Sequence, residues 1–320
     1  MKDISARIMC DEARKMGFKV KTISEDLNMF EIKNGKKTVL FKSIDCGINS
    51  SLGMRFARYK KLTYFMLEQY GIKVPKSIIV ESNIGISDKL KEAGLKFPLV
   101  VKPSVGEHGD GVSVNLKNLK EIGTAIKFAL KYDNKVLVQE FFKGGDFRII
   151  IIGHKFVAAM NRVPAYIIGD GKNSIKEILK KENNNPLRGE GHEKNISKIL
   201  VDKELKRYIA NQGFDLSYIL PKGKKIFVRK NANLSTGGTS IDVSNKIHPE
   251  IIKMCEMASK VLQLNVCGVD YLSEDITKPL KQQKGGIIEV NHTPGLRGHH
   301  FPFEGKSNNV AKEILKLALK

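Results

Sequence analysis

Hydrophobic and polar positions alternate along the first fifty residues in a way that predicts a small αβ unit. An amphipathic pattern indicates a helix over residues 4–16. Three short runs with strand character follow it, at residues 18–23, 28–32 and 37–42. The last two runs meet at Asn34-Gly35, a strong β-hairpin signal. We therefore expect residues 1–50 to form a separate N-terminal αβ unit.

A second αβ layer is predicted to follow. A helical pattern that begins at Phe56 stops at Gly71, and the run VPKSIIV then has the character of a strand. The segment ISDKLKEAG predicts a helix closed by Gly94. Two strand runs, FPLVVKP and GVSVNL, flank a glycine-rich loop, and a helix is expected over residues 118–131.

The rest of the chain predicts mainly antiparallel strands with helices between them. The runs KVLVQEFF, DFRIIIIG and KFVAAMNRV suggest a meander that turns at Gly153-His154. Residues 170–225 are polar and helical in places, and ENNNPLRGEGHEKN is interpreted as a loop. A helix, HPEIIKMCEMASKVLQL, and two strands, VCGVDYLS and GGIIEVN, come last. This segregation favours the α+β class over a doubly wound parallel sheet.

Composition adds limits to this picture. With 320 residues, of which 41% are hydrophobic, the chain can bury a substantial core in two compact units or more. It contains no apolar run of membrane-spanning length, and its first residues lack the apolar region of a signal peptide. Four cysteines without a CxxC pair indicate reduced thiols. We therefore expect a cytoplasmic protein, and assembly into a homo-oligomer stays open.

The net charge of +21 is compatible with three kinds of anionic partner, namely nucleic acid, a membrane surface or an acidic small substrate. Its lysines are spread as single residues and pairs, without the aromatic interleaving of a single-strand binder or a helix-turn-helix pattern. Nucleic-acid binding is therefore only the second hypothesis.

The first group of candidate residues lies in FPLVVKPSVGEHGDGVSV. A strand delivers Lys102 to a loop that begins at Ser104 and contains Gly106, Gly109 and Gly111. Glycines allow a loop to approach phosphates closely and to offer backbone N–H donors. The loop lacks the GK[ST] of a Walker A motif, and an ordinary flexible hairpin is an equally good interpretation of the glycines alone.

A second group could hold a nucleotide and a metal ion. Gln139 and Glu140 end a strand that could face an adenine edge, and Asp146 could bind ribose hydroxyls. Glu289 and Asn291 share one face of a strand, and a carboxylate beside an amide oxygen suits a hard cation such as Mg²⁺. Asp270 on a neighbouring strand would be a third oxygen ligand. The alternatives are a polar strand end and a solvated strand face.

Three arginines complete the candidates. They lie on or beside apolar strands, where burial without an anionic partner would be costly: Arg148, Arg162 and Arg229.

Together these groups resemble the ATP-grasp carboxylate–amine ligases, and among them the ATP-grasp region of cyanophycin synthetase. The resemblance runs from about Ser51 to Pro302 and rests on the phrases RVPAYIIGDGKNSIKEI, NNPLRGEGHEKNISKI, ANLSTGGTSIDVS and GGIIEVNHTPGLR, in that order. It implies two α+β subdomains that clamp ATP, over residues 51–130 and 131–320.

The resemblance also implies roles for individual residues. Lys60 and Lys102 would contact the ATP phosphates, covered by the loop from Gly106 to Gly111. The adenine would be lined by Gln139, Glu140, Phe141 and Phe142, and Asp146 would bind the ribose. Asp270, Glu289 and Asn291 would hold two Mg²⁺ ions, with Mn²⁺ as a possible replacement.

The sequence departs from that family in three respects. It ends at Lys320 without the Mur-ligase-like domain of cyanophycin synthetase, so a two-step polymerising cycle on one chain is not expected. Tyr59 replaces an acidic residue before the lysine, which leaves Lys60 and Lys61 as alternatives. Histidines stand where relatives have small or apolar residues, at His292, His299 and His300.

The expected activity is ATP-dependent formation of an amide from a carboxylate and an amine, through an acyl phosphate, on amino acids or short peptides. The arginines would bind the transferring phosphoryl group or the substrate carboxylate, and the backbone N–H at Gly295 would stabilise the oxyanion. A basic nucleic-acid-binding protein with a vestigial ATP fold and a kinase-like phosphotransferase are the alternatives. The identity of the acid and the amine does not follow from the sequence.

Overall fold

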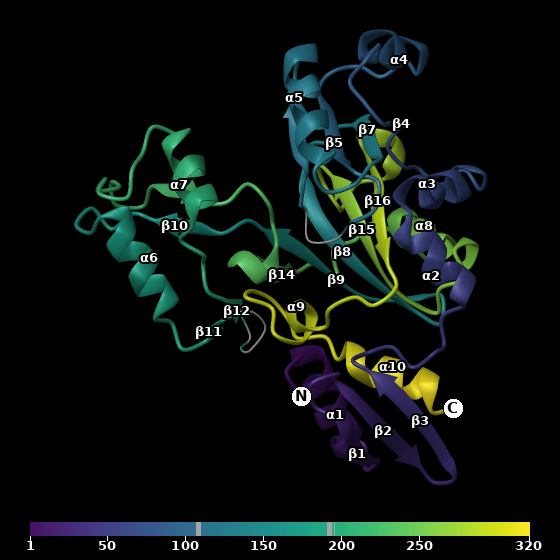
Figure 1. The fold of residues 1–320 in the computed structure, drawn as a ribbon. Coiled ribbons are helices and arrows are strands. Elements are labelled where there is room, and N and C mark those ends of the chain that lie inside the picture. The colour runs from purple at the N-terminus through teal and green to yellow at the C-terminus, as the bar shows by residue number, and fades with distance from the viewer. Residues whose placement is uncertain (107–109, 191–193, 195) are drawn as a thin grey trace. The chain divides into compact units, whose positions relative to one another are not determined.

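The computed structural model describes residues 1–106, 110–190, 194 and 196–320, and the chain divides into two compact units (Figure 1). One contains Met1–Gly47, Val157–Ser244 and Gly295–Lys320, and the other contains Ile48–Phe156 and Asn245–Pro294. Each unit is thus assembled from segments that are distant in the sequence. The predicted division into residues 1–50, 51–130 and 131–320 uses consecutive ranges, and it stays a prediction.

The first unit begins with one helix and a three-stranded antiparallel sheet, as the hydrophobic pattern predicts. The elements are α1 (Ile4–Lys15), β1 (Lys19–Ser24), β2 (Met29–Asn34) and β3 (Lys37–Lys42). Asp3 caps α1 by accepting a hydrogen bond from the backbone N–H of Ser5. The hairpin turn lies one residue later than predicted, at Gly35-Lys36, and Gly35 has a φ of +58° that favours glycine. Phe30 and Phe41 stack beneath this sheet, and α10 (Val310–Ala318) packs against α1.

The middle of the first unit contains two antiparallel strand pairs and two amphipathic helices. β9 (Lys155–Val163) pairs with β14 (Thr239–Asp242), and β10 (Tyr166–Ile168) pairs with β13 (Lys225–Phe227), both antiparallel. The helices α6 (Ile175–Asn183) and α7 (Lys203–Ala210) bury Ile175, Leu179, Leu205 and Ile209 in a shared core. The remaining elements are β11 (Arg188–Gly189), β12 (Ile196–Ser197), η1 (Leu234–Thr236) and α9 (Arg297–His300). The predicted loop over residues 182–195 thus includes the end of α6 and the short strand β11.

The second unit contains a four-stranded antiparallel sheet with the order β4-β7-β5-β6. Its strands are β4 (Ser77–Val80), β5 (Leu99–Pro103), β6 (Ser113–Leu116) and β7 (Val136–Glu140). The helices α4 (Ile86–Glu92) and α5 (Leu119–Ala129) cover one face of this sheet, where they bury Leu90, Ile122 and Ile126 against Val101 and Val138 (Figure 1). The opposite face carries Lys102 and Gln139, because side chains alternate along a strand.

The second unit also contains three long antiparallel strands side by side (Figure 1). These are β8 (Gly145–Ile152), β15 (Val266–Ser273) and β16 (Gly285–Asn291), and the helical elements beside them are α2 (Ser51–Arg58), α3 (Lys60–Glu68), α8 (Pro249–Val261) and η2 (Leu280–Gln282). The single helix predicted from Phe56 is wrong at its start. The helical backbone breaks at Tyr59, whose φ of −104° and ψ of 100° are extended, so two helices meet there.

Two properties bear on the compositional expectations. All four cysteines are free thiols, and Cys10, Cys255 and Cys267 are buried. No helix in the described part of the chain is long and apolar enough to span a membrane.

A close approach of two helices predicts that Gly53 in α2 cannot be enlarged. A Cβ atom at Gly53 would lie 2.3 Å from the carbonyl oxygen of Leu262 and 2.8 Å from that of Gln263, at the end of α8. We expect Gly53→Ala to reduce the free energy of unfolding by about 1–3 kcal/mol, because a methyl group cannot fit without backbone movement. Urea denaturation measures this change.

Gly123→Ala in α5 is the matched control. Its new methyl group would lie 3.6 Å from its nearest neighbour, the side-chain nitrogen of Asn83, and alanine favours a helix over glycine by up to about 1 kcal/mol. Equal unfolding midpoints for both variants would contradict the proposed contact.

Candidate functional site

The register of the long strands aligns three charged residues across the sheet of the second unit. Asp270 in β15 lies opposite Glu289 in β16 and, on its other side, opposite Arg148 in β8. Asn291 lies two residues beyond Glu289, opposite Gly268, so both polar side chains occupy the same face. The predicted oxygen donors are therefore brought together by strand pairing.

Arg148 and Asp270 form a bidentate ion pair. The Nε of Arg148 donates to Oδ1 of Asp270, and its Nη2 donates to Oδ2 at 3.2 Å. Asp270 is only 4% exposed, so the guanidinium compensates a carboxylate that would be costly to bury alone. Gly268 makes room for this arrangement, since a Cβ there would lie 2.8 Å from Cδ of Arg148.

A β-bulge interrupts β16 directly before Glu289. The ladder pairs Asp270 with Glu289 and then Tyr271 with Ile287, so Ile288 has no opposite residue. The carbonyl oxygen of Ile288 accepts a hydrogen bond of 2.6 Å from the hydroxyl of Tyr64 and one of 3.4 Å from Nζ of Lys102. The bulge thus directs a backbone acceptor toward a buried lysine.

Lys60 and Lys102 bring two buried ammonium groups to the same region as these carboxylates. Lys102 is 6% exposed and Lys60 is 7% exposed. Burial, and to a lesser extent the charge of Lys60, lowers the pKa of Lys102 to about 7, against the attraction of Glu289 and Asp270. Two cations in this position favour the binding of an anion with several charges.

The alternatives Lys60 and Lys61 point to different surroundings. Nζ of Lys60 donates to the carbonyl oxygen of Gly106, 2.7 Å away, at the start of the glycine loop. Nζ of Lys61 donates to the carbonyl oxygen of Ser77 at 2.8 Å, in the neighbouring strand β4. The geometry therefore associates Lys60, and not Lys61, with Lys102 and the loop.

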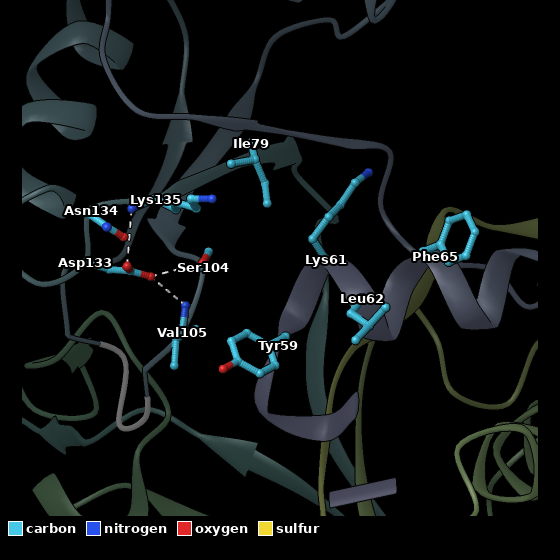
Figure 2. A pocket seen from close by; sticks show the side chains of 10 residues that line it. All are labelled: Tyr59, Lys61, Leu62, Phe65, Ile79, Ser104, Val105, Asp133, Asn134 and Lys135. Carbon is cyan, nitrogen blue, oxygen red and sulfur yellow. Dashed lines mark hydrogen bonds between the residues drawn. The ribbon is translucent and has the colours of Figure 1, made fainter. Parts of the chain in front are cut away.

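Lys61 also lines a cavity of about 660 Å³ on the second unit (Figure 2). Of the predicted site residues the cavity includes only Ser104, and its wall contains Tyr59, Leu62, Phe65, Ile79, Val105, Asp133, Asn134 and Lys135. Asp133 holds the base of the glycine loop by accepting hydrogen bonds from Ser104 Oγ and Val105 N–H, at 3.0 and 2.8 Å (Figure 2). Because Lys102, Asp270 and Glu289 do not line it, this cavity is distinct from the charged site.

The glycine loop itself is described in part. Gly106 has a φ of +141° and Gly111 a φ of +70°, both in the region that favours glycine. Gly109 lies outside the described residues.

Two residues of the segment predicted to line the adenine form hydrogen bonds with other residues of the chain. Gln139 is buried, and its Oε1 lies 3.1 Å from the hydroxyl of Tyr64. Glu140 makes a backbone hydrogen bond with Lys76, and its carboxylate accepts from the N–H of the same residue. Phe141 is half-buried, Phe142 is buried, and Asp146 lies on β8. The adenine and ribose contacts stay predictions.

The other predicted residues belong to the first unit. Arg162 lies on β9 opposite Ser240, and Gly295 has open space where a Cβ would be. Arg229 is 1% exposed and donates to the carboxylates of Asp202 and Glu204, at 2.7 and 2.9 Å, and to the carbonyl of Leu200 at 2.8 Å. These contacts give Arg229 a structural role at the start of α7, and its role in binding substrate stays a prediction.

Two buried arginines of the first unit were not among the candidates. Arg297 donates to Ser197 Oγ and to the carbonyl of Leu234, and Arg188 donates to the carbonyls of Ser197 and Gly237. Both lie inside phrases that carry the family resemblance, and that signal could have identified them. They connect β12, through Ser197, with η1 and with Gly237 directly after it.

Oxygen donors of this kind fit a hard metal ion. Asp270, Glu289 and Asn291 supply carboxylate and amide oxygens, the ligands that Mg²⁺ takes in proteins. Only the amide oxygen of Asn291 could coordinate a metal, whereas its Nδ2, a buried donor without a hydrogen-bond partner among the described residues, suits an oxygen atom of a ligand. No group of three His, Cys, Asp or Glu side chains that could hold a metal was found in the described ranges.

Comparison with known proteins agrees with this arrangement. Residues 57–167 match the model of the RimK-like ATP-grasp domain. The chain carries an ATP-grasp fold. A bifunctional glutathione synthetase from Pasteurella multocida superposes with a TM-score of 0.76 and 25% identity, over 99% of this chain and 44% of that one. The α+β ATP-grasp class inferred from the sequence is therefore confirmed.

Curated relatives of this ATP-grasp chain are longer than it is. A cyanophycin synthetase of Crocosphaera subtropica is 38% identical over 268 residues, which is 83% of this chain and 31% of that protein. The glutathione biosynthesis bifunctional protein GshAB of Clostridium perfringens is 30% identical over 318 residues, 98% of this chain and 41% of that protein. The chain thus spans about a third of the cyanophycin synthetase. ATP-grasp ligases in general use ATP and Mg²⁺.

The lowered pKa of Lys102 predicts a pH dependence of ATP binding. Lys102 carries its charge below a pH of about 7 and loses it above, so the affinity of the free protein for ATP falls as pH rises, by at most about tenfold per unit. Lys102→Arg keeps the charge and flattens the profile, whereas Lys102→Ala weakens binding most below pH 7, where the lysine is charged, without unfolding the protein. Calorimetric titration with ATP from pH 6 to 9 measures this, and parallel profiles for wild type and Lys102→Arg would contradict it.

The contacts of Arg229 predict a loss of stability on its removal. Arg229→Met leaves Asp202 and Glu204 without their partner, and we expect the free energy of unfolding to fall by about 1–3 kcal/mol. Arg207→Met, at an exposed position of α7, removes the same charge and should change stability little. Equal urea midpoints for the two variants would show that these ion pairs do not stabilise the fold.

Proposed function

We propose that the chain is an ADP-forming ligase that joins a carboxylate to an amine on amino acids or short peptides, through an acyl phosphate. The observation that carries the proposal is the buried pair Lys60 and Lys102 in the same unit, and the same electrostatic environment, as Asp270 and Glu289. A metal–nucleotide complex requires cations that bind its phosphates and, beside them, oxygen atoms that bind its metal ion. The relatives' names, which include glutathione biosynthesis, support a peptide-type product.

The candidate residues of the second unit have the following roles in this proposal. Lys60 and Lys102 neutralise the phosphates of ATP, and the loop containing Gly106, Gly109 and Gly111 covers them. Gln139, Glu140, Phe141 and Phe142 line the adenine, and Asp146 binds the ribose. Asp270, Glu289 and Asn291 hold two Mg²⁺ ions or Mn²⁺ in their place. A bound Mg²⁺ would neutralise charge on the transferring phosphoryl group.

The reaction has two balanced steps. The substrate carboxylate attacks the γ-phosphorus of ATP, the bond to the bridging oxygen breaks, and ADP leaves. The amine then attacks the acyl carbon, loses a proton and displaces inorganic phosphate. The chain contributes positioning, exclusion of water by the glycine loop, and charge compensation by Arg148 and Arg162. The N–H group of Gly295 stabilises the oxyanion of the second step.

Product analysis tests this function. Purified protein is incubated with ATP, Mg²⁺ and sets of amino acids and dipeptides, and ADP release is followed together with the mass of any product. The proposal requires ADP release that depends on both an acid and an amine, and a product lighter than their sum by one water. A stable phosphorylated product, formed without an amine, would indicate a kinase-like enzyme. Salt-sensitive DNA retention without ADP release would indicate a nucleic-acid-binding protein.

Replacement of the metal ligands tests the same proposal at residue level. Glu289→Gln removes a carboxylate, so we expect ADP release to fall about a hundredfold or more and to require more Mg²⁺. Asn291→Asp keeps an oxygen donor and should have a milder effect, with a changed preference between Mg²⁺ and Mn²⁺. A magnesium titration of ADP release measures both. Glu92→Gln at the exposed end of α4 is the control, and curves for Glu289→Gln that superimpose on it would exclude the metal assignment.

A further inference from the structure

Tyr64 connects three strands of the second unit through one buried hydroxyl group. The residue lies in α3 and is 0% exposed. Its hydroxyl lies 2.6 Å from the carbonyl oxygen of Ile288 in β16, 3.1 Å from Oε1 of Gln139 in β7 and 3.1 Å from Nζ of Lys102 in β5. In an amphipathic helix a buried tyrosine would ordinarily be explained by the packing of its ring, but three polar neighbours require a further explanation.

Hydrogen-bond chemistry determines the direction of two of these contacts. A lysine ammonium can only donate and a carbonyl oxygen can only accept. The hydroxyl therefore accepts from Lys102 and donates its single proton to the nearer of two acceptors, the carbonyl of Ile288 at 2.6 Å instead of Oε1 of Gln139 at 3.1 Å. Burial raises the pKa of Tyr64 well above its ordinary value, so the proton needed for this donation is retained at neutral pH.

The bulge in β16 makes this contact possible. In a regular ladder Ile288 would lie opposite a residue of β15, but the register passes from Ile287 directly to Glu289. The carbonyl of Ile288 is turned toward Tyr64 and Lys102, and the next residue is the carboxylate Glu289. One hydroxyl thus fixes the ammonium of Lys102 relative to the strand that carries Glu289.

The ammonium group retains a donor for a ligand. Lys102 has three N–H groups, of which one is directed to Tyr64 and one, at 3.4 Å, to Ile288. The ring of Tyr64 also lies beneath the ammonium, with 5.6 Å between Nζ and the ring centroid. Two fixed contacts restrict the flexible lysine side chain to one direction, and the third N–H is available to a phosphate oxygen.

We propose that Tyr64 is a positioning residue that holds the Lys102 ammonium against the bulge at Ile288, so that Lys102 meets the ATP phosphates at a fixed distance from the metal-binding strand. This inference rests on the proposed function. A flexible lysine loses conformational entropy on binding a phosphate, and a preorganised one loses less. Tyr64 therefore contributes to ATP binding through Lys102, without contact with the nucleotide.

A double-mutant cycle separates positioning from packing. Tyr64→Phe keeps the ring and removes the hydroxyl, and we expect the KM for ATP to rise about 10-fold to 100-fold, the range for hydrogen bonds to charged groups. In a Lys102→Ala background the same change should have little further effect, because no ammonium remains to be positioned. Tyr70→Phe, at an exposed position after α3, is the control and should leave the KM unchanged.

The outcomes of this cycle are distinct. One contrary result is that Tyr64→Phe lowers the melting temperature and leaves the KM for ATP unchanged, and another is that it raises the KM for ATP by the same factor with and without Lys102. Either result would show that the positioning role is wrong while the proposed function stands. If Lys102→Ala itself has no effect on the KM for ATP, both the positioning role and the assignment of Lys102 are overturned. A rise in the KM for ATP on Tyr64→Phe that is absent in the Lys102→Ala background supports the proposal.

A second variant preserves the test if Tyr64→Phe does not fold. Incorporation of 3,5-difluorotyrosine at position 64 keeps the shape of the ring and makes its oxygen a weaker acceptor for Lys102. We expect a smaller rise in the KM for ATP than with phenylalanine, again only while Lys102 is present. An unchanged KM in this folded protein would overturn the inference.

Discussion

The pairing of β15 with its two neighbours is the constraint on which the site depends. In one register Asp270 lies between Arg148 and Glu289, and a shift of β15 by one residue would move Asp270 to the opposite face of the sheet, away from both. The bulge at Ile288 belongs to the same register, because it adds one residue before Glu289 and leaves a carbonyl for Tyr64 and Lys102. The positions of the carboxylates and of the lysine are thus consequences of backbone hydrogen bonding.

This arrangement buries two lysine side chains of like charge, which is energetically unfavourable in the absence of an anion. Lys60 and Lys102 are both nearly inaccessible, and the charge of Lys60 contributes to the lowered pKa of Lys102. Arg148 already compensates Asp270, so Glu289 remains the nearby carboxylate that favours the charged form of Lys102. A bound polyanion would restore the balance, which explains physically why such a region is suited to a nucleotide and a metal.

Buried arginines in the first unit differ from these lysines, because their charges are paired with groups of the fold itself. Arg229 meets two carboxylates at the start of α7, and Arg188 and Arg297 donate to backbone carbonyls in β12, in η1 and directly after η1. An apolar neighbourhood in the sequence made Arg229 a candidate for substrate binding, but burial of a guanidinium is equally satisfied by partners within the fold. The presence of partners, which only coordinates reveal, separates the two explanations.

The sequence by itself determined the elements and the general chemistry of this protein. The helical and alternating patterns specify α1, α5, α8 and the long strands, since these depend on neighbours within a few residues, and the strand period places Glu289 and Asn291 on one face. The choice of Lys60 over Lys61 beside Lys102, the bulge at Ile288, the helix break at Tyr59 and the partners of Arg229 depended on the tertiary structure. Tyr64 and Ile288 are 224 residues apart, and no local pattern records a hydrogen bond over that separation. Such contacts exist only once the strands have paired and the helix has packed against them.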